Sequence, residues 1–238
     1  MSIDVVYKIG QKCSSTWPEY QELRYSIRSL SLFSDLGRVF IVGHKPDWLK
    51  NVVHIPVSDP YKRNKDANLI NKMLLASFSD VSDQFLNMSD DQYFLKKTSI
   101  DQIIPIGISR PGKGNDPWNK RRKNTVKALQ QAGKPHDYDF EGHCPYVLDK
   151  NLYPSAVLNY SYGEAPGMLG NTLYHNHYEI GPHKNIDHVG GAGLKATKQE
   201  IIETGNKFRF LNINHGLTDV HKGFLMGKFP EKSPYEIQ

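Results

Sequence analysis

Cysteine is scarce in this sequence: Cys13 and Cys144 are the only two among 238 residues. They do not form a Cys-x-x-Cys pair, which argues against a cysteine-based zinc site. Two isolated cysteines also provide no disulfide framework of the kind that stabilises small secreted domains. We therefore expect free thiols and a reducing compartment.

Long apolar runs are missing as well. No stretch approaches the roughly 20 apolar residues that a membrane-spanning helix needs. The N-terminal segment MSIDVVYKIG lacks the basic start and the long apolar run of a signal peptide. We expect a cytoplasmic protein that does not insert into a membrane.

The residues that are present are largely polar and aromatic. The apolar fraction of 38% is low for a globular protein, whereas 13 Tyr and 10 His occur. Tyrosine and histidine often line sites for sugars and phosphates, although a single tyrosine is more often a residue at the edge of a core. A net charge of +5 suits anionic ligands such as nucleotides, polyphosphates, nucleic acid or acidic glycans, without choosing among them.

In the N-terminal part, short apolar runs alternate with segments of three-four apolar spacing. This alternation predicts a βαβ arrangement with parallel strands, and ligands bind beyond the carboxyl ends of such strands. The predicted strands are residues 3–7, 38–42, 51–55 and 84–88, and the predicted helices begin at Pro18 and span 65–78.

The later part of the chain is less regular. We expect strands at 103–108 and 207–213, a polar loop at 109–124, helices at 125–132, 151–162 and 169–179, and a turn at 190–193. The tail GFLMGKFPEKSPYE is expected to form a short helix and then an extended piece. The length supports one α/β domain, and no internal repeat is visible, so we expect a single domain over residues 1–238.

The segment FLNMSDDQYFL, residues 85–95, places Asp90 and Asp91 directly after an apolar strand. Two carboxylates at a strand end can hold a hard cation such as Mg²⁺ or Mn²⁺, which prefers oxygen ligands and also accepts diphosphate oxygens. The alternative is a solvated acidic turn between two strands. The flanking apolar strands favour the metal site.

This acidic pair resembles the DxD-type motif of GT-A glycosyltransferases. Other segments resemble, in the same order, the Stealth-type family of capsular polysaccharide transferases. They are DVVY at 4–7, ELRYSIRSL at 22–30, VFIVGHKPDWL at 39–49, FLNMSDDQYFL at 85–95 and, more weakly, EGHCPYVLDK at 141–150 and FPEKSPYE at 229–236. The chain is shorter than those enzymes and lacks their DVVYTWVDG-like turn. That difference weakens the expectation of sugar-phosphate transfer more than the expectation of a nucleotide-sugar fold.

The resemblance implies a GT-A-like, Rossmann-type α/β fold, with a mostly parallel sheet flanked by helices and an irregular C-terminal half. Residues 1–108 would bind a nucleotide-sugar donor together with Mn²⁺ or Mg²⁺, and residues 109–238 would face the acceptor. The implied function is metal-dependent transfer of a sugar to a glycan or to a modified DNA base. Sugar-1-phosphate transfer, as in Stealth-type enzymes, is an alternative, and the oligomeric state is not predicted.

The donor site of the family carries over residue by residue. Asp91 would bind the metal directly, and Asp90 would lie beside the metal or the ribose. Arg24, on the first predicted helix, would face the diphosphate or the donor. Within KRNKDANLINK, the residues that would contact base, ribose and diphosphate are Lys65, Asp66, Asn68 and Lys72.

The later half provides candidates for catalysis and for a further metal ligand. An inverting transfer needs a general base, and Glu141, His143 or Asp139 in the segment YDFEGHCPY is the candidate. In a retaining transfer these residues would position the acceptor instead. The candidates for a late metal ligand, in NINHGLTDVHKG, are His215, His221 and Asp219.

Residues 110–127 carry seven Lys or Arg and one Asp around the aromatic Trp118. Clustered cations beside an aromatic ring can neutralise phosphates and stack on a base. We consider a lid over the donor diphosphate, a DNA-binding surface and a plain surface loop. With DNA as partner, the protein would be a bacteriophage glycosyltransferase in the host cytoplasm or a non-catalytic nucleic-acid-binding protein. The candidate acceptor-binding residues are Arg110, Lys113, Trp118, Arg121 and Arg122.

Overall fold

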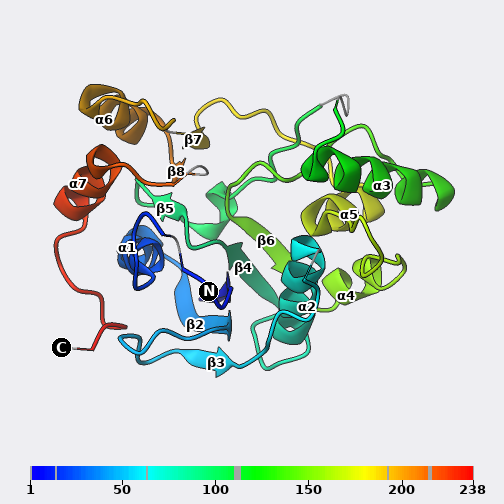
Figure 1. The fold of residues 1–238 in the computed structure, drawn as a ribbon, viewed down its shortest axis with the longest axis horizontal. Helices are drawn as coiled ribbons and strands as arrows, with labels where there is room; N and C mark the ends of the chain where they lie inside the picture. The colour runs from blue at the N-terminus through cyan, green and yellow to red at the C-terminus, as the bar shows by residue number, and fades with distance from the viewer. Residues whose placement is uncertain are drawn as a thin grey trace.

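The structure is a computed structural model, and it describes residues 2–13, 15–62, 64–109, 114–191, 193–213 and 216–237. In this part of the chain, helices flank a larger and a smaller β-sheet (Figure 1). The predicted α/β class is therefore confirmed.

The larger sheet is built from buried apolar strands. Its strand order is β3 (Val53–Ile55), β2 (Leu36–Gly43), β1 (Ile3–Ile9), β4 (Gln84–Met88) and β6 (Tyr146–Asp149). The first four strands are parallel, and β6 runs antiparallel to β4. The four parallel strands were all predicted, so the mostly parallel sheet is confirmed. The short strand β6 was not predicted.

Two helices from the N-terminal half pack against this sheet, as predicted. Helix α1 (Gln21–Ser29) continues into the 3-10 helix η1 (Leu30–Leu32), and α2 (Lys65–Ser77) follows β3. Figure 1 shows α1 on one side of β2 and β4, and α2 on the other. The side chain of Asn64 caps α2 by accepting a hydrogen bond from Ala67 N at 3.1 Å. This cap fixes where α2 begins.

Helix α3 (Pro117–Gln131) begins inside the segment that was predicted to be a polar loop. The carboxylate of Asp116 accepts hydrogen bonds from the backbone of Trp118 and Asn119 at 3.1 and 3.0 Å. An aspartate cap followed by proline is a strong helix start, so the prediction of a loop up to residue 124 was wrong.

The predicted strand at 103–108 is also wrong. A 3-10 helix, η2 (Ile100–Gln102), precedes this stretch. Among the described residues, Ile106 and Ile108 then form only isolated bridges to distant residues.

Six further elements follow in the later half of the described chain. They are α4 (Leu152–Val157), α5 (Gly170–His177), β7 (Val189–Gly191), α6 (Lys198–Lys207), β8 (Phe210–Asn212) and α7 (Asp219–Lys228). The predictions of α4, α5 and β8 are confirmed with reduced bounds, and α6 was not predicted. The predicted turn at 190–193 is wrong at its start, because Gly190 and Gly191 belong to β7.

The smaller sheet connects the end of the chain to the acidic turn. Its strand order is β5 (Gln92–Phe94), β8 and β7, with β5 antiparallel and β7 parallel to β8. Strand β5 follows directly after Asp91. Beyond β8, the backbone N–H of Ile213 donates to the carbonyl oxygen of Asp91 at 3.3 Å. A late segment therefore holds the acidic turn in place.

The core draws on both halves of the sequence. One cluster of buried apolar residues extends in sequence from Ile3 to Phe210, and a second includes Tyr93, Leu211 and Leu225. Both cysteines are free thiols, as expected. Within the described residues, no helix combines the length and the apolar character that crossing a bilayer requires.

Candidate functional site

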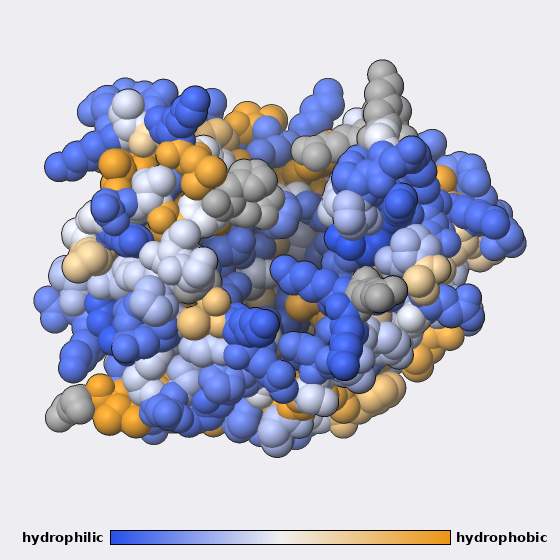
Figure 2. Space-filling view, in the orientation of Figure 1, coloured by the Kyte–Doolittle hydropathy of each residue, from blue (hydrophilic) through white to orange (hydrophobic). Residues whose placement is uncertain are grey.

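A polar cavity lies at the carboxyl ends of β1 and β4, the edge where parallel sheets bind ligands. Its volume is about 600 Å³. Figure 2 shows the molecule hollowed near the middle of the view, with hydrophilic residues around the hollow. The charged lining comprises the cations Lys8, Lys12, Lys65, Lys72 and Arg121 and the acids Asp59, Asp66, Asp90, Asp91 and Glu141.

The two adjacent acids Asp90 and Asp91 lie in this cavity, just beyond β4. Burial, and secondarily the neighbouring Asp91 carboxylate, raise the pKa of Asp90 to about 6. Burial also raises the pKa of Asp91. Two recessed carboxylates that repel each other would be stabilised by a divalent cation.

The donor set at this position fits Mg²⁺ or Mn²⁺ better than zinc, because it offers carboxylate oxygens and no thiolate. The described residues contain no group of three or more His, Cys, Asp or Glu side chains that could hold a metal. An ion bound by the acidic pair would therefore need further oxygen ligands, such as those of a diphosphate and water.

A chain of hydrogen bonds crosses the floor of the cavity. The Lys8 ammonium donates to Asn87 Oδ1, Asn87 Nδ2 donates to Asn171 Oδ1 at 3.1 Å, and Asn171 Nδ2 donates to Glu141 Oε2 at 3.3 Å. The other carboxylate oxygen of Glu141 accepts from the backbone N–H and hydroxyl of Thr172 at 3.1 and 3.3 Å. The chain fixes the orientation of both amide groups, because Lys8 can only donate.

Both ends of this chain have shifted pKa values. Burial lowers the pKa of Lys8 to about 8, against the opposing effect of Glu141 and the acidic pair. Burial, followed by the charge of Asp66, raises the pKa of Glu141 to about 7. A carboxyl group that titrates near neutral pH suits general acid or base chemistry.

The four predicted donor-binding residues of α2 all line the cavity. Lys72 is 2% exposed, donates to Ile9 O at 2.9 Å and lies 2.6 Å from an Asp59 oxygen. Asn68 bonds both the N–H and the carbonyl of Tyr61 at 3.0 Å. These two side chains therefore support the loop before α2 from inside the cavity.

The start of α2 is tied to the start of α3 across the cavity. Asp66 and Arg121 form an ion pair, and both side chains are mostly shielded from solvent. Burial raises the pKa of Asp66, and the Arg121 charge opposes that rise. Trp118 and His143 line the same cavity, so the structure brings them together with Glu141.

Five predicted site residues do not line the cavity, among them Asp219, whose side chain is exposed and pairs with Lys222. Asp139 is buried in an ion pair with Arg122 at 3.3 Å. The Arg24 guanidinium stacks over Trp48 at 4.5 Å. His221 is buried at the start of α7, with Nδ1 2.8 Å from the hydroxyl of Thr218.

A sequence cannot distinguish such supporting side chains from site residues, because both are polar. Three further predictions, Arg110, Lys113 and His215, lie outside the described residues.

Sequence reasoning missed several residues of the cavity. Lys8 lies just past the predicted end of β1, and Asn87 lies within the predicted β4. The sequence could therefore have placed both residues at the carboxyl ends of strands, where ligands bind. Asn171 gave no such signal, because only the packing of α5 brings it to the cavity floor.

Comparisons with known proteins bear on the fold. No protein-family model matches the chain, and no curated protein matches it either. Among solved structures, the galactosyltransferase LgtC in complex with donor and acceptor sugar analogues is similar, with a TM-score of 0.53, 10% sequence identity and 98% coverage of both chains. An active-site mutant of LgtC gives a TM-score of 0.52 with the same identity and coverage.

At 10% identity, this similarity shows the fold. The chain has a GT-A glycosyltransferase fold, in agreement with its mostly parallel central sheet and flanking helices. The comparisons give no support to the Stealth-type family or to a bacteriophage role in DNA modification.

Proposed function

We propose that this chain is a metal-dependent glycosyltransferase that moves a sugar from a nucleotide-sugar donor to a glycan acceptor. The observation that carries the proposal is the pair Asp90 and Asp91, recessed in a cation-lined cavity at the carboxyl ends of parallel strands. The diphosphate of such a donor provides the negative charge that this cavity attracts. The LgtC structure of the same fold contains donor and acceptor sugar analogues.

Asp90 and Asp91 are the proposed ligands of Mn²⁺ or Mg²⁺. The ion would neutralise the diphosphate and stabilise it as a leaving group. We propose His215 as the late ligand because it follows Ile213 by two residues, and Ile213 is bonded to Asp91. His221 fits this role less well because its side chain is fully buried and does not line the cavity.

The cations of the cavity are proposed to bind the donor diphosphate, with Lys65 from α2 and Lys8 from β1, whereas Lys72 is already paired with Asp59. Glu141 is proposed to act on the acceptor hydroxyl. It would accept the proton if the transfer inverts the anomeric centre, and it would position the hydroxyl if the transfer retains it. Trp118, at the start of α3, is proposed to contact the acceptor.

Calorimetric titration of UDP, GDP and their sugar conjugates, with and without Mn²⁺, tests this proposal. We expect binding that requires the metal and is lost in Asp91→Asn, which removes one charge without changing size. Asp83→Asn is the matched control, because the Asp83 side chain is 82% exposed, precedes β4 and does not line the cavity. Equal nucleotide binding without metal, or in Asp91→Asn, would contradict the metal role, and no binding by any nucleotide would contradict the donor.

A further inference from the structure

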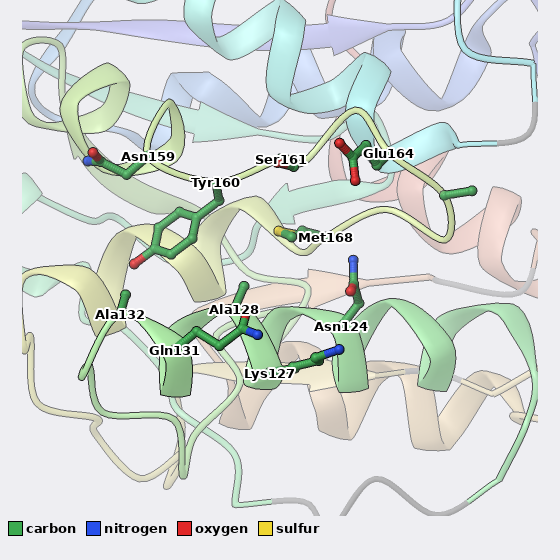
Figure 3. Close-up of a pocket in the computed structure, with 11 residues that line it drawn as sticks. Asn124, Lys127, Ala128, Gln131, Ala132, Asn159, Tyr160, Ser161, Glu164 and Met168 are labelled. Atoms are coloured by element: carbon green, nitrogen blue, oxygen red, sulfur yellow. The ribbon is translucent and has the colours of Figure 1, made fainter.

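A second hollow lies between helix α3 and residues 159–168 (Figure 3). Its volume of about 420 Å³ lies within the range of small-molecule sites. Figure 3 shows Asn124, Lys127 and Gln131 on the helix side, and Tyr160 and Glu164 on the opposite side. The first hollow is the catalytic cavity of the proposed function, and this one is separate from it.

Helix α3 connects the two hollows. Trp118 and Arg121 line the catalytic cavity, whereas Asn124, Ala128 and Gln131 line the second hollow. The spacing of three or four residues places all five on one face of the helix. From Arg121 to Gln131 this face extends about 15 Å, at a rise of 1.5 Å per residue. A ligand that occupies both hollows would therefore lie parallel to this helix and would cross the segment 167–169 that separates them.

The wall between the hollows is fixed to the same helix. Asn124 Nδ2 donates to Gly167 O at 3.0 Å, and Leu169 N donates to the Thr125 hydroxyl at 2.9 Å. On this segment, Met168 lines the second hollow and Leu169 lines the catalytic cavity. Met168 and Leu169 are adjacent in sequence but line different hollows. The hydrogen bonds from this segment to α3 fix the spacing between the two hollows.

The chemistry of the second hollow suits a neutral polyol. Lys127, Gln131 and Glu164 make no side-chain hydrogen bond or ion pair with any other described residue, so their donors and acceptors remain available to a ligand. The charges of Lys127 and Glu164 balance. The aromatic ring of Tyr160 and the side chain of Met168 add apolar surface. Hydroxyl groups both donate and accept, and they match this mixture of groups.

The same helix offers little to a nucleic acid, which needs a surplus of free cations. Arg121 is paired with Asp66, Arg122 is buried against Asp139, and the Lys123 ammonium donates to the carbonyl of Gly114 at 2.7 Å. Within the described residues of this region, both arginine charges are therefore neutralised by protein carboxylates and are not available to phosphates.

We propose that the second hollow is a subsite for the distal sugar units of a neutral oligosaccharide acceptor, whose reacting end enters the catalytic cavity. This inference rests on the proposed function, and it assigns the acceptor to glycans rather than to DNA. It predicts that the enzyme prefers acceptors long enough to reach from Arg121 to Gln131.

The test compares acceptors of one and four sugar units, in series built from glucose, galactose and N-acetylglucosamine. The double variant Lys127→Ala/Gln131→Ala removes two hydrogen-bonding side chains from the hollow. Lys120→Ala is the control, because Lys120 is exposed on the same helix and lines neither hollow. The double variant should raise KM for the tetrasaccharide about tenfold. KM for the monosaccharide and the rate of donor hydrolysis in water should not change.

Three results would overturn the subsite. These are KM values independent of acceptor length in every series, an equal effect of Lys120→Ala, and inhibition by a DNA duplex that the double variant abolishes. If the wild type neither hydrolyses the donor nor glycosylates any acceptor, the proposed function fails instead. Saturation-transfer NMR of the tetrasaccharides, with wild type and double variant, then tests the subsite without turnover: a signal lost in the variant supports it, and no signal refutes it.

Discussion

Hydrogen bonding and burial have opposite effects on the pKa of Glu141. Its carboxylate accepts hydrogen bonds from Asn171 and from two groups of Thr172, which favour the ionised form. Burial favours the neutral form and has the larger effect, so the pKa rises to about 7. The charged groups that face it are Asp66, Asp139 and Lys8. The protonation of this side chain therefore changes within the physiological pH range.

This balance predicts a pH-dependent difference in stability between the wild type and Glu141→Gln. In the unfolded chain Glu141 loses its proton near its ordinary value of 4.5, and in the folded protein only near 7. As pH rises through this window, the wild type should therefore lose more free energy of unfolding than the glutamine variant, in which only the other buried acids still titrate. The difference in free energy of unfolding between wild type and Glu141→Gln should grow from pH 4.5 to pH 7 and then remain constant. Urea denaturation at several pH values measures it.

The slope with pH is the readout, because glutamine also loses the hydrogen bond from Asn171 at every pH. Glu203→Gln, at an exposed position of α6, serves as the control and should run parallel to the wild type. Parallel curves for Glu141→Gln as well would show that the carboxyl group titrates normally.

Among single residues, the sequence predicted those whose positions follow from a strand end or from a helix. Asp90 and Asp91 follow a buried strand, and the four α2 residues occupy the first turns of a helix that begins at the same sheet edge. Asp139 was predicted as a site residue because it shares the segment YDFEGHCPY with Glu141, and Arg122 because it belongs to the basic segment around Trp118. Only the tertiary structure shows that they neutralise each other away from the cavity.

Among the strands, the longer ones gave the clearest signal, although the three-residue strands β3 and β8 were also predicted. Strands β1, β2 and β4 have five to eight residues and are mostly buried, so they stand out as apolar runs. Strands β5 and β7 have three residues each, and β7 contains two glycines. Such strands exist because β8 lies between them, and pairing over a long sequence distance leaves no local signal.

Helix α1 carries an ion pair that joins it to the tail. Arg28 donates to both carboxylate oxygens of Glu236 at 2.7 and 2.8 Å, and to the carbonyl of Phe229 at 3.1 Å. Both side chains of the pair are buried. The pair therefore fixes the segment after α7 against α1.

Breaking this pair from one side should destabilise the protein strongly. Arg28→Met removes the two short bonds to the buried Glu236 carboxylate and leaves it Ser233 and the more distant Arg24, at 3.8 Å, which costs about 3 kcal/mol. Urea denaturation at pH 7 measures the loss. Lys222→Met is the control, because it removes an exposed pair and should change stability by less than about 1 kcal/mol. A small loss for Arg28→Met would mean that the tail moves and exposes Glu236 to water.

On the scale of the whole molecule, the two predicted halves do not form separate units in the core. Residues 1–108 supply Lys8 and Asp91 to the cavity, and residues 109–238 supply Glu141 and Asn171. Strand β6 pairs with β4, so the larger sheet also crosses the boundary. Residues 1–238 are thus proposed to unfold as one domain.

Differential scanning calorimetry tests this proposal. We expect one unfolding transition whose midpoint rises with Mn²⁺ and the bound nucleotide, since binding at 100 times Kd stabilises the folded state by about 2.7 kcal/mol. Two transitions, with only one shifted by the ligand, would show that the halves unfold independently.

The hydrogen bond from Ile213 to Asp91 also bears on how the protein is made. The acidic turn leaves the ribosome well before β8 and Ile213 are synthesised. A nascent chain that has completed β1, β2 and β4 therefore carries the two aspartates on a turn that is not yet fastened. The proposed cation site should form only after β8 has docked beside β5.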